Sequence, residues 1–308
     1  MSAIYFEETC QLRGNSIIIY SKPHYDKLKS SMSSQQRAVW KLLQQQRLKN
    51  SMNKKETYSG SLTQGTKKRM TRAISMLLQA SISRVVFNPC TRKNEKFLLN
   101  FLTLTIPLQE KNVDLKTGYK TLLKPFLQWL YKTQGVRSYI WKAERTKKGE
   151  LHYHITTNHF IHKAALQNKW NYLLTKNNLL DRYIKKHKHS NAPSTRVNKV
   201  YKIRDLQSYL TKEFTKAYQN NHNCKGKIWD CSINLKGVKY FEVPLSEFHE
   251  RKLFFYDKNL KLWEVNTEHC TILKCQKQWS SSILTATELN SYRNLLKQIR
   301  NEQTTLFN

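Results

Sequence analysis

Long hydrophobic runs are missing from this sequence of 308 residues. No uninterrupted apolar stretch approaches the roughly 18 residues that a membrane-spanning helix requires. The start of the chain, MSAIYFEETC, carries glutamates where a secretory signal peptide has basic residues followed by an apolar run. We therefore expect a soluble, non-secreted protein that works in the cytoplasm and does not enter a membrane.

Acidic residues are scarce as well. The chain has 21 Asp and Glu against 54 Lys and Arg, which gives a formal net charge of +33 and a pI near 10.0. Such an excess repels itself and is usually compensated by a polyanion, with nucleic acid as the first candidate and an anionic membrane surface as the second. The 12 Phe, 16 Tyr and 7 Trp offer stacking surfaces for unpaired bases, which favours a single-stranded partner.

Cysteines are too few and too scattered for a disulfide framework in a chain of this length, since there are only six. Two cysteine pairs, separated by six and four residues, have a histidine nearby, and a zinc site would draw on Cys224, Cys231, Cys270, Cys275, His222 and His269. These spacings match no common zinc-binding motif, so we expect reduced cytosolic thiols instead.

The chain is expected to contain three regions. Residues 1–90 are basic and mainly helical, with amphipathic helices over 33–55 and 64–82 joined by a turn-rich linker. Residues 91–235 form the best organised part. Residues 236–308 are a C-terminal extension with short strand-like segments and a basic helix over about 286–303.

The middle region alternates between strand and helix patterns. Strands are expected over 96–107, 138–146, 150–157 and 195–203, and helices over 117–135, 162–186 and 205–219. A hairpin among crossover helices predicts an α+β fold with a mainly antiparallel sheet and helices on one face.

Two histidines, His152 and His154, lie one residue apart in GELHYHITTN, residues 149–158. Side chains alternate along a strand, so both imidazoles share one face while Tyr153 and Ile155 point to the core. Residues 147–149, Lys-Lys-Gly, fit a three-residue hairpin turn whose last position favours glycine. Centring the hairpin on residue 148 pairs Thr146 with Glu150, Glu144 with His152, and Lys142 with His154.

This register brings one carboxylate, Glu144, and two imidazoles, His152 and His154, to one place, which is a plausible site for a divalent cation. Mixed nitrogen and oxygen ligands suit Mn²⁺ well, and Mg²⁺ if water completes the shell. The alternative is a pair of exposed imidazoles without a ligand. His187 and His189 have the same spacing within a polar loop, where we expect no site.

The order of these motifs resembles the HUH endonucleases, and among them the rolling-circle replication initiators (Rep proteins) of small plasmids and single-stranded DNA phages and viruses. FLTLT (101–105) looks like motif I, and LHYHITT (151–157) looks like motif II, with Glu144 eight residues before the first histidine. YLTK (209–212) looks like motif III, and GKIWDCSINL (226–235) is similar to a tract that follows motif III in some phage Reps. The resemblance covers about residues 95–235 and implies an HUH core of the ferredoxin-like or RRM-like type.

The resemblance implies metal-dependent nicking and joining of single-stranded origin DNA. Tyr209 would be the nucleophile that forms a 5′-phosphotyrosyl link, and Lys212 would assist it. The pattern Tyr-x-x-Lys also occurs at Tyr139, on the strand before motif II, and at Tyr183, which remains the rival candidate. The sequence contains no G-x-x-x-x-G-K-[ST] motif, so unwinding would need a host helicase, beside a host polymerase, in a bacterial plasmid or phage setting.

Several polar and basic residues around the motifs are expected to contact DNA: Thr103, Thr105, Lys142, Arg145, Lys147, Lys148 and Lys216. Two other functions remain open. One is an HUH transposase or relaxase that uses the same chemistry for strand transfer. The other is a non-catalytic nucleic-acid-binding protein, which would explain the positive charge equally well.

Overall fold

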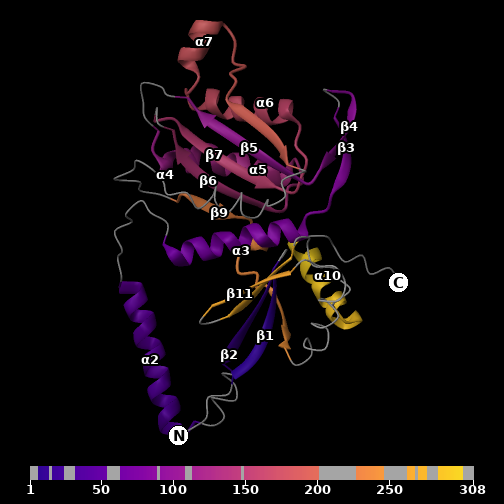
Figure 1. Ribbon diagram of the computed structural model, residues 1–308. Helices are drawn as coiled ribbons and strands as arrows, with labels where there is room; N and C mark the ends of the chain where they lie inside the picture. The colour runs from indigo at the N-terminus through magenta and orange to yellow at the C-terminus, as the bar shows by residue number, and fades with distance from the viewer. Residues whose placement is uncertain are drawn as a thin grey trace, which may run out of the picture. The chain divides into compact units, whose positions relative to one another are not determined.

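The computed structural model describes residues 6–13, 16–23, 32–53, 63–88, 91–107, 113–146, 149–200, 227–245, 262–267, 270–275 and 284–300. The chain divides into two compact units, which we call the terminal unit (residues 1–57 and 239–292) and the core unit (residues 58–238 and 293–308). Each unit has a five-stranded sheet whose paired strands are antiparallel, which confirms the predicted α+β class (Figure 1). Within the described residues, every helix is too short or too polar to span a bilayer.

The sheet of the terminal unit joins strands from both ends of the chain. Its order is β10-β1-β2-β12-β11, with β1 (Phe6–Arg13), β2 (Ser16–Pro23), β10 (Phe241–Pro244), β11 (Leu262–Asn266) and β12 (Thr271–Cys275). One face carries Cys10, Leu12, Ile17 and Val243, each at most 1% exposed. The unit also contains α2 (Ser34–Asn53), and α10 (Ala286–Arg300) contributes residues to both units.

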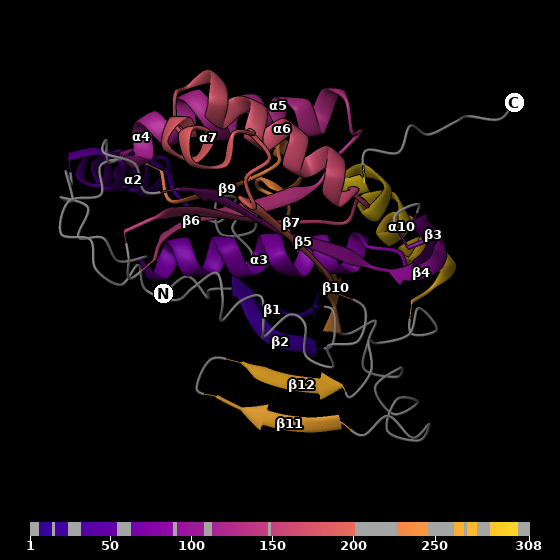
Figure 2. The ribbon, with the colours of Figure 1, turned by 90° about the horizontal axis from the view of Figure 1, so that it is seen from above.

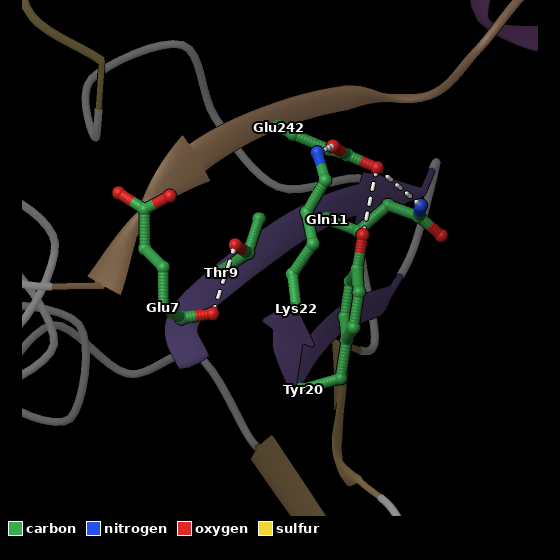
Figure 3. A network of polar contacts seen from close by, with 6 residues as sticks. All are labelled: Glu7, Thr9, Gln11, Tyr20, Lys22 and Glu242. Carbon is green, nitrogen blue, oxygen red and sulfur yellow. Dashed lines mark hydrogen bonds and ion pairs between the residues drawn. The ribbon is translucent and has the colours of Figure 1, made fainter. Parts of the chain in front are cut away.

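The opposite face of this sheet carries a polar network around Glu242 (Figure 3). The carboxylate accepts hydrogen bonds from Lys22 Nζ at 2.7 Å, Tyr20 Oη at 2.8 Å and Gln11 Nε2 at 3.0 Å. Burial acts to raise the pKa of Glu242, but these three hydrogen bonds outweigh it and hold the pKa below its ordinary range. Burial and the bond to Glu242 raise the pKa of Tyr20 to about 12.

The core unit contains the segment in which the sequence predicts the functional residues. Its sheet has the order β8-β5-β7-β6-β9, with β5 (Leu99–Ile106), β6 (Tyr139–Arg145), β7 (Leu151–Thr157), β8 (Thr195–Val200) and β9 (Trp229–Cys231). Its helices are α3 (Gln64–Ala80), α4 (Leu115–Gly118), the π-helical turn η1 (Tyr119–Leu123), α5 (Lys124–Lys132), α6 (Lys163–Lys176), α7 (Asp181–His187) and the 3₁₀ turn η2 (Ile233–Leu235). A separate hairpin is formed by β3 (Arg84–Asn88) and β4 (Lys93–Phe97).

The central strand β7 defines the two faces of the core sheet. Tyr153 lies on what we call the helix face, where its ring contacts Trp141 and Trp170 with centroid distances of 6.1 and 6.3 Å. His152 and His154 lie on the other side, the histidine face. Figure 2 shows α5 and α6 on one side of this sheet and α3 on the other, where α3 packs against β6 and η2. The expectation of helices on one face is therefore incomplete, because α3 covers part of the histidine face.

Most elements predicted for the core are present, but the long helix expected over 162–186 is wrong. Asn178 adopts a φ of +57°, and the amide of Leu179 donates to the carbonyl of Leu174 at 2.9 Å. A left-handed residue of this kind ends a helix, so α6 stops and α7 begins separately. The helix expected over 205–219 lies outside the described residues.

The division into units differs from the expected boundaries at residues 90 and 235. Strands β1 and β2 lie in the region that was expected to be mainly helical, and β1 pairs with β10 from the C-terminal region. Pairing over such a sequence separation leaves no local signal, because each strand shows only its own alternation. The expected core of 91–235 nevertheless falls entirely within the core unit.

We expect Gly118→Ala to destabilise the core unit. A Cβ atom at this position would lie 2.7 Å from the hydroxyl of Tyr153 and 3.1 Å from Leu151 Cδ2, and both side chains are buried. Alanine favours a helix over glycine by about 1 kcal/mol, whereas forced overpacking costs about 1–3 kcal/mol. Chemical denaturation should therefore show a net loss of about 1 kcal/mol. In a double-mutant cycle, Tyr153→Phe should reduce the cost of Gly118→Ala, and simple additivity would contradict the collision.

We expect Glu242→Gln to weaken the terminal unit in a pH-dependent way. A carboxyl whose pKa is lower in the folded than in the unfolded chain stabilises the fold above the unfolded value of about 4.3, and this stabilisation disappears as the pH falls through the folded value. Near pH 7 the free energy of opening at β1 amides, measured by hydrogen exchange, should fall by about 1 kcal/mol. The two proteins should converge in acid, and a constant difference at all pH values would argue against a charged Glu242 in the network.

Candidate functional site

The hairpin of β6 and β7 brings a carboxylate and two imidazoles to the histidine face. The cross-strand partners are Glu144 with His152 and Lys142 with His154. The amide of Thr146 donates to the carbonyl of Glu150 at 2.9 Å, and Gly149 has a φ of +89°. The register predicted from the three-residue turn is thus confirmed, including the glycine at its left-handed position.

His154 has a polar neighbour at each ring nitrogen. Its Nδ1 lies 3.3 Å from Thr103 Oγ1 on β5, and its Nε2 lies 3.4 Å from Glu144 Oε2. Thr103 and His154 are direct cross-strand partners, and the ring of Phe101 stacks on the imidazole with centroids 5.5 Å apart. These contacts hold the ring so that Nε2 faces the carboxylate.

His152 has a different environment. Its Nε2 is buried and has no hydrogen-bond partner in the described part of the chain, and Glu150 Oε2 lies 3.8 Å away, beyond hydrogen-bond distance. Burial, followed by the charge of His154, lowers the pKa of His152 below its ordinary range. A neutral imidazole with an unshared ring nitrogen is the form that binds metal ions.

The side chains themselves do not form a three-membered cluster. Across the described ranges, no group of three or more His, Cys, Asp and Glu side chains is arranged to hold a metal ion. Glu144 approaches His154, while Glu150 is the carboxylate beside His152. Convergence at Glu144, His152 and His154 is therefore a property of the backbone register, and the Glu144 side chain, 38% exposed, has room to change rotamer.

Sequence reasoning did not include Glu150 and Phe101 among the site residues. Glu150 precedes His152 by two positions, so the same alternation that links the histidines places Glu150 on their face. Phe101 belongs to the strand beside β7, and its stacking on His154 depends on strand order, which the sequence does not reveal.

The residues expected to contact DNA on the histidine face are Thr103, Thr105 and Lys142. The two threonines lie on β5 opposite His154 and His152 and are half-buried. Lys142 is only 2% exposed, so its ammonium group reaches a phosphate only if the side chain moves. The threonines are the more accessible members of this group.

Arg145 lies on the helix face, away from the imidazoles. Its guanidinium donates to the carbonyl of Gly149 at 2.8 Å and to the carbonyl of Val113 at 2.6 Å. These bonds tie the hairpin to the segment before α4, which gives Arg145 a structural task in the described fold. The other basic residues expected at DNA lie outside the described residues: Lys147, Lys148 and Lys216.

The expected nucleophile Tyr209 and its partner Lys212 also lie outside the described residues. Tyr139 lies on the helix face of β6, and burial, with the charge of Asp230, raises its pKa to about 12. Both features argue against Tyr139 as a nucleophile. Tyr183 on α7 donates from Oη to the carbonyl of Asn191 at 3.3 Å, and its ring packs against His187 with centroids 4.4 Å apart.

The cysteines with described side chains are free thiols, namely Cys10, Cys231 and Cys270. Burial raises the pKa of Cys231 to about 11, which keeps this thiol protonated at neutral pH. The free state of these three agrees with the expectation of reduced thiols. Several members of the zinc alternative lie outside the described residues, among them Cys224, His222 and His269.

Comparison with known proteins places the candidate site in a replication context. No curated protein and no solved structure matches the chain. Residues 100–218, less than half of the chain, match a family model described as replication-associated protein ORF2. This segment includes β6, β7 and β8, the paired residues Glu144, His152 and His154, and the expected nucleophile Tyr209. The part of the protein that carries the candidate site is therefore similar to replication-associated proteins.

Proposed function

We propose that this protein initiates rolling-circle DNA replication by nicking and rejoining single-stranded origin DNA. The similarity of residues 100–218 to replication-associated proteins supports a role in replication, and the net charge of +33 supports a polyanionic partner. The observation that carries the nicking proposal is the register of β6 and β7, which sets Glu144 opposite His152 with His154 next on the same face.

The donor set fits a divalent cation such as Mn²⁺ or Mg²⁺. Two imidazoles and a carboxylate are mixed ligands of the type that Mn²⁺ accepts, and Mg²⁺ accepts them with water in its shell. The buried Nε2 of His152, without a hydrogen-bond partner in the described structure, fits the same role. Glu144, His152 and His154 would hold the ion, which when bound supplies Lewis-acid polarisation of the scissile phosphate.

Thr103 is a positioning residue in this proposal. Its hydroxyl occupies Nδ1 of His154, which leaves Nε2 as the nitrogen available to a ligand. Hydrogen bonds to the second nitrogen commonly orient a metal-binding histidine and fix its tautomer.

Tyr209 is the proposed nucleophile, and Lys212 assists it from one helical turn away. A phenol with a pKa near 10 is a poor nucleophile until its phenolate is stabilised, and a neighbouring ammonium group provides that stabilisation. The Tyr209 oxygen bonds to phosphorus, the bond from phosphorus to the 3′ oxygen breaks, and the phenol proton ends on the released 3′-hydroxyl. The 5′-phosphotyrosyl bond replaces a phosphodiester, so attack by a 3′-hydroxyl reverses the step and rejoins the strand.

A covalent-adduct assay tests this function. The protein is incubated with 5′- and 3′-labelled single-stranded oligonucleotides that tile both strands of the DNA encoding it, with Mn²⁺ or with chelator. We expect a Mn²⁺-dependent adduct with the 3′-side fragment that Tyr209→Phe abolishes. Tyr183→Phe is the matched control, because it removes the same hydroxyl from the rival motif and should retain the adduct.

Each other result of the assay has a definite meaning. Loss of the adduct only in Tyr183→Phe would retain the enzyme class and move the nucleophile to α7. Tight binding with no adduct on any strand would refute nicking and favour a non-catalytic nucleic-acid-binding protein. Efficient joining to unrelated DNA ends, without preference for one origin strand, would favour a transposase-like or relaxase-like strand transferase.

Thr103→Val should weaken metal binding without removing a ligand. Loss of a hydrogen bond that orients a metal-binding histidine typically reduces affinity about 10- to 100-fold. Titration with Mn²⁺, followed by electron paramagnetic resonance, measures this directly. Thr105→Val is the control, because Thr105 lies on the same face of β5 but its hydroxyl bonds to neither imidazole in the described structure. Equal Mn²⁺ affinities of the two variants would refute the positioning role of Thr103.

A further inference from the structure

A second basic site lies at the edge of the core sheet. A pocket of about 470 Å³ is lined by α3 and by residues 227–237, all within the core unit. Its volume falls within the roughly 300–1,000 Å³ that is usual for small-ligand sites. Nothing in the proposed cleavage chemistry uses this pocket.

The charged residues of the pocket are mostly basic: Arg69, Arg72, Lys227, Lys236 and Asp230. Asp230 accepts hydrogen bonds from Lys227 Nζ at 2.5 Å and Lys236 Nζ at 3.1 Å. Burial acts to raise the pKa of Asp230, but the bonds from these lysines and from the Cys231 amide outweigh it and hold the pKa below its ordinary range. The single carboxylate is thus committed to the lysines.

The two arginines are the cations left for an external anion. Arg69 donates to Thr66 Oγ1 at 3.2 Å, and no carboxylate in the described ranges pairs with Arg69 or Arg72. They lie one helical turn apart on α3, so both face the pocket. Guanidinium groups in this arrangement suit a phosphate, which accepts paired N–H donors.

Trp229 gives the pocket an aromatic wall. It is half-buried on the edge strand β9, and among the described residues no other ring stacks on it. His154, Lys142 and Trp229 are consecutive cross-strand neighbours on β7, β6 and β9, so they share the histidine face. With strands about 4.8 Å apart, the backbone of Trp229 lies roughly 10 Å from that of His154.

We infer that this pocket holds one unpaired nucleotide of single-stranded DNA beside the candidate site, with its base against Trp229 and its phosphate on Arg69 and Arg72. The inference rests on the proposed function for the identity of the polymer. An aromatic wall next to two unpaired guanidinium groups is the combination that binds a nucleotide of a single strand. A phosphate alone would use the arginines but leave the aromatic wall without a partner.

Equilibrium binding tests the pocket separately from catalysis. Fluorescence anisotropy of a labelled oligodeoxythymidine of about 16 nucleotides, in chelator and over a range of salt concentrations, measures affinity and its salt dependence. The variants are Trp229→Ala, Trp229→Phe and Arg72→Ala. Arg182→Ala is the matched control, because it removes the same charge from an exposed position on α7.

We expect Trp229→Ala to bind about tenfold more weakly with an unchanged salt slope, because it removes stacking and no charge. Trp229→Phe should retain most of the affinity, which also guards against a loss of folding. Arg72→Ala should reduce the slope of log affinity against log salt by about 0.7, the value for one phosphate contact with a single strand. Thymidine monophosphate should compete at the pocket of the wild type better than inorganic phosphate.

Two results would overturn the inference: affinities of Trp229→Ala and Arg72→Ala equal to that of Arg182→Ala, or the same losses on duplex DNA. The covalent-adduct assay is independent of this test. A tenfold loss in Trp229→Ala without any adduct in the wild type would support the pocket and refute nicking. An adduct with normal binding by both pocket variants would refute the pocket alone.

Discussion

Backbone pairing between β6 and β7 decides which side chains share the histidine face. Side chains alternate along a strand, so a slip by one residue would turn His152 and His154 toward the buried aromatic side of the sheet. The turn that ends at Gly149 sets this register, and its φ of +89° is one that glycine adopts without strain. Every contact of the candidate site follows from that pairing, including the position of Glu144 opposite His152.

The helix face gives the histidine face a rigid support. Tyr153 lies between two tryptophan rings, and Trp170 of α6 donates from Nε1 to the carbonyl of Thr105 on β5 at 2.9 Å. This bond ties a covering helix to the strand that also carries Thr103. Large buried rings and a satisfied indole donor resist displacement. The strands beneath the imidazoles are therefore held from the opposite side, while the imidazoles remain only partly covered.

The scarcity of acidic residues shapes both sites on this face. With 54 basic and 21 acidic residues, most positive side chains have no carboxylate to pair with, and a phosphate backbone is the natural counter-charge. The carboxylates that are present have specific tasks in the described fold. Glu144 and Glu150 lie beside the imidazoles, Asp230 holds two lysines, and Glu242 organises the polar face of the terminal unit.

The sequence alone determined the class of the fold, the position of the hairpin and the register that pairs Glu144 with His152, because alternation and turn chemistry are local properties. Local pattern did not show that Asn178 ends α6, since a left-handed asparagine is one option among several. Only the tertiary structure decided that β1 pairs with β10, that Glu150 lies nearest His152 in side-chain space, and that α3 meets Trp229 at a pocket. These features depend on residues far apart in the chain and on rotamers, which packing selects and sequence spacing does not encode.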